Sequence, residues 1–307
     1  MTTPASPSLG ERAFVALQYA LPKHLLSRLV HRATRSRIVP FKNALISAFV
    51  RGYRPEMQDA VQGNPLAYGS FNEFFTRELR AGSRPMPAEI AQIASPVDGT
   101  VSEAGRIDNN QLLQAKGHRY SLEALLAAAA GDVAVFRGGD FMTVYLAPYN
   151  YHRIHMPQSG RLVDCVVVPG ELFSVNGTTA TLVPGLFTRN ERVICRFEGA
   201  HGSFVMVLVG ALHVGSMQTV WHGEVTPRRP RRVLQLPTAA LAAPALLDRG
   251  AEIGRFNMGS TVIVIWPPGM VQLDAKVRAG QVLRMGERVA TTISRLARPL
   301  SGGNDAV

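Results

Sequence analysis

Long apolar runs are missing from this chain of 307 residues, and no stretch of 18 or more consecutive apolar side chains occurs. A helix that crosses a bilayer needs about 20 such residues, so the sequence predicts no transmembrane span. The N-terminus also lacks the basic start, apolar core and small-residue cleavage site that mark a secretory signal peptide. We therefore expect the protein to stay on the cytoplasmic side of the membrane.

Cysteine is also scarce, because Cys165 and Cys195 are the only two in the chain. Their separation matches no metal-binding or redox motif, which argues against a zinc site or a disulfide framework. Both lie in apolar, strand-like stretches and are expected to be buried thiols. With 46% hydrophobic and 18% charged residues, the composition is that of a folded protein with a sizeable core.

Acidic residues are nearly absent from the first 54 positions, where nine Lys and Arg side chains face a single acid, Glu11. This segment carries most of a net charge of +11. Its apolar residues recur at helical spacing, interrupted at Pro22 and Pro40, which predicts short amphipathic helices with a basic face. Such helices suit an anionic membrane surface, or form an arm packed on the rest of the protein. No recognised nucleic-acid motif accompanies the charge, so DNA binding is disfavoured.

The remaining chain has the pattern of an α+β protein with a mainly antiparallel β domain and peripheral helices. Short β-rich runs separated by Gly or Pro extend over residues 95–270. Helices are expected at Ser70–Leu79, where Ser70 and Glu73 fit a capping box, and at Ser121–Ala130, closed by Gly131. Residues 236–247 are rich in Ala, Leu and Pro and fit a loop or a broken helix.

The most distinctive local feature is Gly259-Ser260-Thr261, which directly precedes the apolar run Val262–Trp266. A serine hydroxyl can attack the carbonyl of the preceding residue, and glycine leaves that carbonyl open and tolerates strain. The resulting ester can eliminate, which leaves the serine as a pyruvoyl group. Four other Gly-Ser pairs occur in the chain, so taken alone the dipeptide also fits a turn.

A serine nucleophile needs a base, and a base works best when a carboxylate orients it. Asp98 lies in the Pro- and Gly-bracketed turn Ser95–Val101, which suits either a positioned carboxylate or a simple Asx-turn. His152 and His155 lie in the segment Tyr151–Pro157 and are either functional or ordinary core and surface histidines. Residue types alone do not separate the roles of the two histidines.

Several motifs together resemble those of the phosphatidylserine decarboxylases in order and spacing. They are Phe71–Arg77, Pro96–Thr100, Tyr151–Pro157, Phe173–Asn176 and Met258–Thr261. They extend over most of the chain, and five motifs in one order are far more specific than any single one. Bacterial members usually carry Leu at the position of Met258, a change that conserves volume.

The resemblance implies a helical membrane-association region at 1–60 and a catalytic domain at 61–307. It implies autocleavage between Gly259 and Ser260 into a β chain, 1–259, and an α chain, 260–307, by an Asp98-His155-Ser260 triad with His155 as base. A pyruvoyl group from Ser260 then serves as cofactor, and phosphatidylserine is decarboxylated through a Schiff base to phosphatidylethanolamine. His152 is the candidate proton donor.

The resemblance also assigns substrate binding to the segment that contains Phe173, Val175 and Asn176, with Phe173 shielding the ketone and Asn176 binding phosphate or carboxylate. It implies a peripheral protein on the cytoplasmic face of the membrane, whose β and α chains form a heterodimer or a dimer of heterodimers. Three alternatives stay open: a pyruvoyl decarboxylase of a soluble amino acid, a histidine phosphocarrier domain, and a metal enzyme with His152, His155 and Asp98 as ligands.

Overall fold

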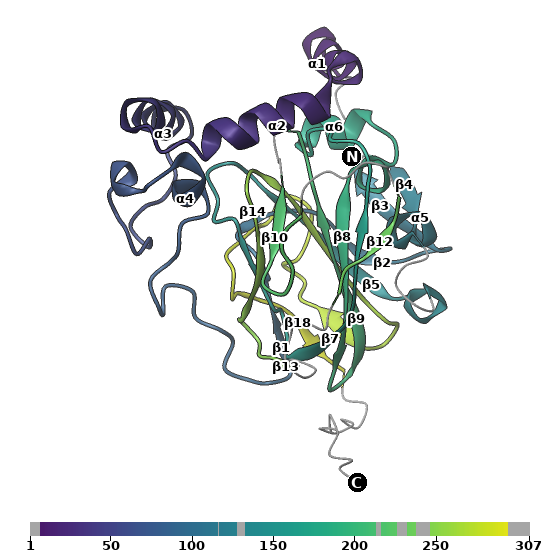
Figure 1. Ribbon diagram of the computed structural model, residues 1–307. Helices are drawn as coiled ribbons and strands as arrows, with labels where there is room; N and C mark the ends of the chain where they lie inside the picture. The colour runs from purple at the N-terminus through teal and green to yellow at the C-terminus, as the bar shows by residue number, and fades with distance from the viewer. Residues whose placement is uncertain are drawn as a thin grey trace.

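The computed structural model describes residues 7–115, 117–127, 133–212, 216–225, 232–237 and 246–293. Three N-terminal helices lie along one end of a β-rich body, and the expected α+β class is confirmed (Figure 1). None of the described helices is long and apolar enough to cross a membrane.

The three N-terminal helices follow the proline positions in the sequence. They are α1 (Leu9–Ala20), α2 (Lys23–Thr34) and α3 (Val39–Tyr53). Pro22 directly precedes α2, and Pro40 lies in the first turn of α3, where its missing N–H costs no intrahelical hydrogen bond. Ser8 and Glu11 form a capping box at the start of α1.

The largest sheet has nine strands, and all its pairings among the described residues are antiparallel. Its strand order is β12 (Leu234–Gln235), β7 (Gly160–Val168), β8 (Arg192–Gly199), β9 (Gly202–Val209), β15 (Ser260–Trp266), β5 (Asp140–Leu146), β2 (Gly99–Arg106) and β17 (Val282–Leu283), with β13 (Leu246–Leu247) also paired to β7. All seven residues of β15 are buried because this strand lies between β9 and β5.

Smaller sheets and short helices complete the body. The four-stranded sheet has the order β11 (Gly223–Val225), β10 (Met217–Thr219), β14 (Glu252–Phe256) and β6 (Arg153–His155). The others pair β1 (Gln92–Ala94), β18 (Arg288–Thr292) and β16 (Val271–Leu273), and β3 (Gln111–Ala115) with β4 (His118–Ser121). The helices are α4 (Phe71–Phe75), α5 (Leu122–Leu126), α6 (Gly177–Leu182) and α7 (Leu186–Arg189), with 3-10 turns η1 (Pro65–Ala67) and η2 (Val133–Phe136).

Two expected helices are shorter than the sequence predicts. In α4, Ser70 caps the N–H of Glu73, but the Glu73 carboxylate accepts from Gly69 instead, and Thr76 bonds back to the carbonyl of Asn72. Helix α5 ends at Leu126 because Arg192 donates to the carbonyls at positions 124 and 125. The expected closing residue, Gly131, lies outside the described residues.

Two further sequence expectations meet different outcomes. The thiols of Cys165 and Cys195 are buried on paired strands with their sulfurs 3.7 Å apart, so the expectation of buried free thiols is confirmed. Within the segment 236–247, Leu246–Leu247 form strand β13 rather than a loop or helix. Residues 238–245 lie outside the described part of the chain.

A second hydrophobic cluster ties α3 to α4. Ile46 and Phe49 of α3 are buried against Phe71, Phe74 and Phe75. The Phe49 ring lies 5.3 Å from that of Phe71, edge to face, a geometry that adds to simple burial. The last of the N-terminal helices is therefore part of a core and not a detachable arm.

Candidate active site

Ser260 begins the central strand of the large sheet. It pairs with Leu146 at the end of β5, and its side chain is fully buried. Its Oγ atom has no hydrogen-bond partner. Leaving a buried hydroxyl unpaired costs about 1–3 kcal/mol, so such a group invites a functional explanation.

His152 lies beside the peptide that precedes Ser260. A first side-chain carbon at Gly259 would lie 3.6 Å from the Nε2 atom of His152. Nδ1 of His152 lies 2.9 Å from the carbonyl oxygen of Asn150, which can only accept. Neutral His152 therefore carries its proton on Nδ1, and Nε2 is left as an acceptor without a partner.

The surroundings of His152 keep it neutral. Its ring is fully buried and lies 4.1 Å from the ring of Phe75 in α4. Burial, the largest effect, and the positive charge of Arg77 lower the pKa of His152 to about 3. At neutral pH this side chain is therefore a base and hydrogen-bond acceptor next to Gly259.

Arg77 fixes the loop that carries His152. Its guanidinium is buried and donates from Nη2 to the carbonyl oxygens of Tyr149 and Asn150, at 3.1 and 3.4 Å. His152 and Arg77 thus share the carbonyl of Asn150. The segment Phe71–Arg77 therefore supports His152 in two ways: the ring of Phe75 packs against the imidazole, and Arg77 holds the loop before it.

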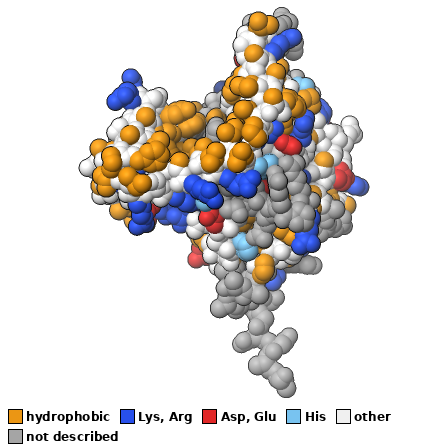
Figure 2. Space-filling view, turned by 45° about the horizontal axis from the view of Figure 1, so that its top comes forward, with side chains coloured by type: hydrophobic (Ala, Val, Ile, Leu, Met, Phe, Trp, Pro, Cys, Tyr) orange, Lys and Arg blue, Asp and Glu red, His pale blue; other side chains and the backbone are white. Residues whose placement is uncertain are grey.

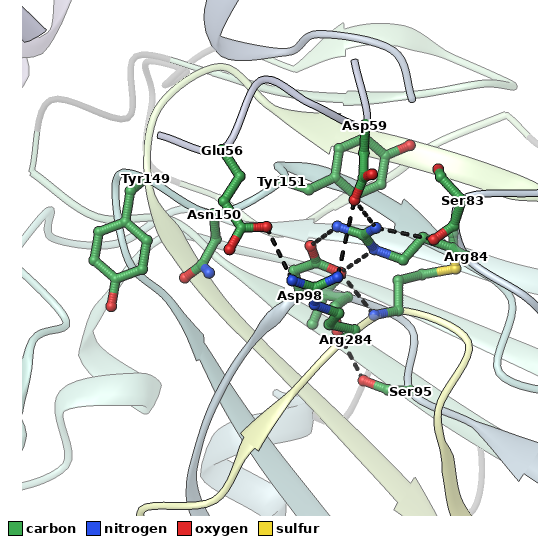
Figure 3. A network of polar contacts seen from close by, with 12 residues as sticks. Glu56, Asp59, Ser83, Arg84, Ser95, Asp98, Tyr149, Asn150, Tyr151 and Arg284 are labelled. Carbon is green, nitrogen blue, oxygen red and sulfur yellow. Dashed lines mark hydrogen bonds and ion pairs between the residues drawn. The ribbon is translucent and has the colours of Figure 1, made fainter. Parts of the chain in front are cut away.

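Asp98 is held in a separate ionic cluster (Figure 3). Its two carboxylate oxygens accept from Nε and Nη2 of Arg84, at 3.0 and 2.7 Å, and Oδ1 also accepts from the N–H of Met285. Nη1 of Arg84 donates to Asp59 at 2.7 Å. Burial would lower the pKa of Arg84, but the hydrogen bonds that it donates to Asp98 and Asp59 raise it above its ordinary value.

His155 has both ring nitrogens engaged. Nδ1 lies 2.8 Å from the carbonyl oxygen of Gly250, and Nε2 lies 2.9 Å from the hydroxyl of Tyr151. The Gly250 carbonyl requires the proton on Nδ1, so Nε2 accepts from Tyr151. Burial lowers the pKa of His155, while the charge of Asp98 acts weakly in the opposite direction.

The expected direct contacts of the triad are not formed. Although all three residues are described, no hydrogen bond joins any two of Asp98, His155 and Ser260. Arg84 and a backbone N–H occupy the Asp98 carboxylate, and Tyr151 occupies the free nitrogen of His155. Asp98 and His155 are nevertheless on adjoining segments, because the N–H of His155 donates to the carbonyl of Pro96.

A cavity of about 420 Å³ reaches Met258 and Gly259 from the side of α3. It is lined by Gly259 and Met258, by Val175 and Asn176, and by aromatic side chains that include Tyr53. Asn176 also caps α6 by accepting from the N–H of Thr179 at 3.0 Å. The structure thus brings two of the three expected substrate-binding residues to the same cavity as Gly259.

Phe173 is the exception, since it is not among the residues that line this cavity. Its buried ring contacts Tyr19 of α1 at 4.8 Å between centroids, and the Nζ atom of Lys23 lies 4.3 Å from its centre. The expected role of shielding a ketone therefore has no support in the geometry. Phe173 packs against the N-terminal helices instead, because an aromatic face attracts a nearby cation.

Sequence reasoning missed Arg77, Arg84 and Asn257 as parts of this site. Arg77 stood within a recognised motif and was the easiest of these to find. Arg84 carries no local signal among the many arginines, because its partners Asp59 and Asp98 are distant in sequence. Within the described ranges no cluster of three His, Cys, Asp or Glu side chains is suited to hold a metal, and His152, His155 and Asp98 form none.

Comparison with known proteins agrees with the motifs. A family model described as phosphatidylserine decarboxylase matches residues 71–291, and a second, described as PSD, matches residues 13–54. Three similar curated proteins are each named phosphatidylserine decarboxylase proenzyme. The protein from Bordetella petrii is 48% identical over 280 residues, which cover 91% of this chain and 97% of the relative.

Of the other two relatives, one comes from the same genus and one from a second genus. The Bordetella avium protein is 46% identical over 289 residues, covering 94% of this chain and 98% of the relative. The Pseudomonas aeruginosa protein, from strain LESB58, is 48% identical over 284 residues, covering 92% and 98%. The resemblance drawn from the sequence motifs is thereby confirmed: the chain belongs to the phosphatidylserine decarboxylase family.

Proposed function

We propose that this chain decarboxylates phosphatidylserine to phosphatidylethanolamine with a pyruvoyl group made from its own Ser260. The observation that carries the proposal is the buried, unpartnered hydroxyl of Ser260, directly after Gly259, which lines a cavity. The unpartnered Nε2 of His152 lies close to the same peptide. A buried nucleophile beside a buried acceptor fits proton transfer better than it fits structural support.

Maturation begins when Ser260 Oγ loses its proton and attacks the carbonyl carbon of Gly259. The peptide C–N bond breaks and an ester C–O bond forms. A base then removes the proton on the α-carbon of residue 260, the ester eliminates, and Gly259 leaves as a carboxylate. Water enters and ammonia leaves the resulting enamine, which gives a β chain 1–259 and an α chain 260–307 with a pyruvoyl end.

Either of two histidines can be the base that takes the proton of the Ser260 hydroxyl. We retain the set of Asp98, His155 and Ser260 that the motifs imply, in which His155 must first exchange its contact with Tyr151. His152 is the competing base, since its acceptor nitrogen already lies next to Gly259. Separate substitution of the two histidines distinguishes these assignments.

A pyruvoyl group at position 260 supplies the electron sink that makes loss of carbon dioxide feasible. The residues around position 260 fit such a group, because this position is fully buried at the start of β15 and the residue before it, Gly259, has no side chain. Nε2 of His152, unprotonated in the free chain, would take a proton from the ammonium group of the bound substrate and return it to the substrate carbon after decarboxylation, and Phe75 and Arg77 hold its ring and loop in place.

The two chains stay together after cleavage. Strand β15, at the start of the α chain, pairs with β5 and β9 of the β chain along nearly its whole length. Strands β17 and β18 pair with β2 and β1. The product is therefore a heterodimer held by sheet hydrogen bonds and buried apolar side chains.

The substrate choice rests on the N-terminal helices. Large apolar side chains are exposed there, and Figure 2 shows hydrophobic side chains over these helices with Lys and Arg at their margins. They are Leu9, Phe14, Leu17, Leu25, Leu29, Ile38, Val39 and Phe41. This surface suits peripheral attachment to an anionic lipid surface on the cytoplasmic face, for which a soluble amino-acid decarboxylase has no use.

The activity test uses purified full chain with phosphatidylserine in vesicles and, separately, free serine and other soluble amino acids. We expect carbon dioxide to be released from phosphatidylserine and from none of the soluble amino acids. Treatment with borohydride in the presence of phosphatidylserine should abolish this release. Equal or greater release from a free amino acid would support the soluble decarboxylase instead. No release from any substrate by a chain that has cleaved itself would contradict both.

Attachment is best tested by point substitutions, because removal of residues 1–54 would also remove Ile46 and Phe49 from a core. Changing Leu25, Leu29 and Phe41 to Ser is expected to weaken co-sedimentation with phosphatidylglycerol vesicles about tenfold or more, with cleavage retained. The matched control changes Val61, Ile90 and Val282, which are apolar and even more exposed elsewhere on the molecule, to Ser. Equal loss in both variants, or in neither, would sink the attachment surface.

A further inference from the structure

Asn257 holds the segment just before the cleavage site. It is buried, its backbone N–H donates to the carbonyl of Ser216, and its Nδ2 donates to the Ser216 hydroxyl at 2.6 Å. Its Oδ1 accepts from the side chain of Asn72, the second residue of α4, at 3.3 Å. The position of residues 257–259 is thus set by side chains outside the catalytic group.

Glu224 on β11 joins this anchor to helix α2. Its Oε1 atom accepts from the Ser216 hydroxyl and from Arg35, the residue that caps α2, and lies 2.8 Å from Nε2 of His31. Arg35 also reaches the Ser216 hydroxyl at 3.3 Å. One carboxylate oxygen therefore connects the last turn of α2 to the residue that holds Asn257.

The other side of α2 faces outward. Leu25 and Leu29 are about half exposed on it, and they belong to the proposed lipid-facing surface. Figure 1 shows α2 crossing above β10 and β14, the strands that lead from Ser216 and into Asn257. Helix α2 thus has an exposed apolar face and, at its C-terminal end, an ionic contact with Glu224. Glu224 in turn accepts from Ser216, the residue that holds Asn257.

The charge state of Glu224 suits this role. Burial would raise the pKa of Glu224, but the hydrogen bonds from Ser216 and His31 and the charge of Arg35 lower it below its ordinary value. The carboxylate is therefore ionised at neutral pH and accepts charge-assisted hydrogen bonds, which are stronger and more directional than neutral ones.

We propose that Glu224 is a positioning residue that couples helix α2 to the cleavage segment, so that seating of α2 on an anionic lipid surface accelerates self-cleavage at Ser260. The inference rests on the proposed function for both the cleavage site and the lipid surface. Glu224 does not touch the reacting atoms. It acts through Ser216 and Asn257, whose hydrogen bonds hold the chain two residues before Gly259.

The test follows cleavage of freshly synthesised full-length chain with time, with phosphatidylglycerol vesicles or with phosphatidylcholine vesicles. For the natural sequence we expect cleavage to be about tenfold faster with the anionic lipid, the change expected from about 1.4 kcal/mol in the barrier. Glu224→Gln and Arg35→Met are each expected to remove this acceleration, and the double variant to be no slower than either single one.

The matched control is Arg32→Met, which removes one positive charge from the exposed side of the same helix without touching Glu224. Arg32→Met is expected to keep the acceleration by anionic lipid. Arg35→Lys is expected to keep part of the acceleration that Arg35→Met loses. A thermal midpoint equal to that of the natural sequence shows that a slow variant is folded. If Glu224→Gln does not fold, Arg35→Met and its rescue by Arg35→Lys decide the question.

The outcomes separate this inference from the proposed function. If the natural sequence never cleaves at Ser260, the proposed function itself fails. If it cleaves at the same rate on both lipids, or if Glu224→Gln and Arg35→Met keep the full acceleration, the coupling is wrong while the self-cleavage stands. Loss of acceleration in Arg32→Met as well would reduce the effect to the net charge of α2 and would also overturn the coupling.

Discussion

Two clusters of polar side chains in this fold differ in whether their polar atoms have partners. In the Asp98 cluster, formed by Asp59, Arg84 and Asp98, each charged group is bonded to an opposite charge or to a backbone donor. In the Ser260 cluster, formed by His152, Gly259 and Ser260, the serine hydroxyl and one imidazole nitrogen have no partner. The first cluster is saturated and the second is not.

The difference indicates where chemistry takes place. A saturated ionic cluster fixes the backbone around it and resists change, because removal of one member leaves buried charge uncompensated. Unpartnered buried atoms cost stability and persist where the rest of the fold enforces them, which is common at reactive sites. The bond that breaks therefore lies in the Ser260 cluster, and the triad implied by the motifs requires a rearrangement in which His155 leaves Tyr151 and reaches Ser260.

The largest expected effect is that of Ser260→Ala. Without the hydroxyl there is no nucleophile, so cleavage should fall from complete to undetectable on a denaturing gel, and activity should fall with it. Thr261→Val is the matched control, because Thr261 is a buried residue whose hydroxyl also has no partner and which points to the opposite face of β15. Cleavage in Ser260→Ala, or its loss in Thr261→Val, would contradict the assignment.

The two histidines give the next largest effect. His155→Ala and Asp98→Ala are expected to block cleavage, whereas His152→Ala should allow cleavage yet lower turnover by about 10²–10⁴, the usual contribution of a proton donor. Gel analysis and single-turnover assays on the same preparations measure both quantities. If His152→Ala blocks cleavage and His155→Ala cleaves normally, the roles are reversed and the geometry of the uncleaved chain identifies the base.

The Asp98 cluster is tested by Arg84→Met, which removes the cation from the buried Asp98 and the nearest cation from the partly exposed Asp59. We expect a loss of about 3–5 kcal/mol in the free energy of unfolding, measured by urea denaturation. Arg137→Met is the control, since its ion pair with Glu123 is exposed and pairs of that kind contribute about 0–1 kcal/mol. A loss below 1 kcal/mol for Arg84→Met would remove the contrast between the two clusters.

The smallest effect concerns pH. Burial lowers the pKa of His152 from 6.5 to about 3, so between these values the unfolded chain binds a proton that the folded chain does not. Stability from this group is present above pH 6.5 and is lost as the pH falls, by about 2 kcal/mol down to about pH 5. His152→Asn should flatten this part of the stability profile, and His118→Gln on β4 should not.

Patterns within one element predicted much of the fold. Helical spacing and Pro22 and Pro40 predicted α1 to α3, and β-branched runs predicted β7, β8, β9 and β15. The errors came from contacts between distant segments. Arg192 ends α5 early by bonding its last carbonyls, and no feature of the local sequence reports that contact.

The same distinction holds at the site. Co-ordered motifs led to Gly259, Ser260 and His152, which the structure brings together, and to Val175 and Asn176 beside the same cavity. They did not reveal that Arg84 occupies Asp98 or that Tyr151 occupies His155, because both contacts depend on side-chain directions. Phe173 was assigned to the substrate by its position in a motif, whereas packing against Tyr19 and Lys23 decides its place.

The central claim is self-cleavage at Gly259–Ser260 with conversion of Ser260, and intact-mass spectrometry of the purified natural protein tests it most directly. The account predicts two chains, 1–259 and 260–307, with the smaller one lighter by one ammonia than a fragment that begins with serine and refractory to Edman sequencing. A single chain of full mass that decarboxylates phosphatidylserine at full rate, or a smaller chain that begins with an ordinary serine, would contradict it.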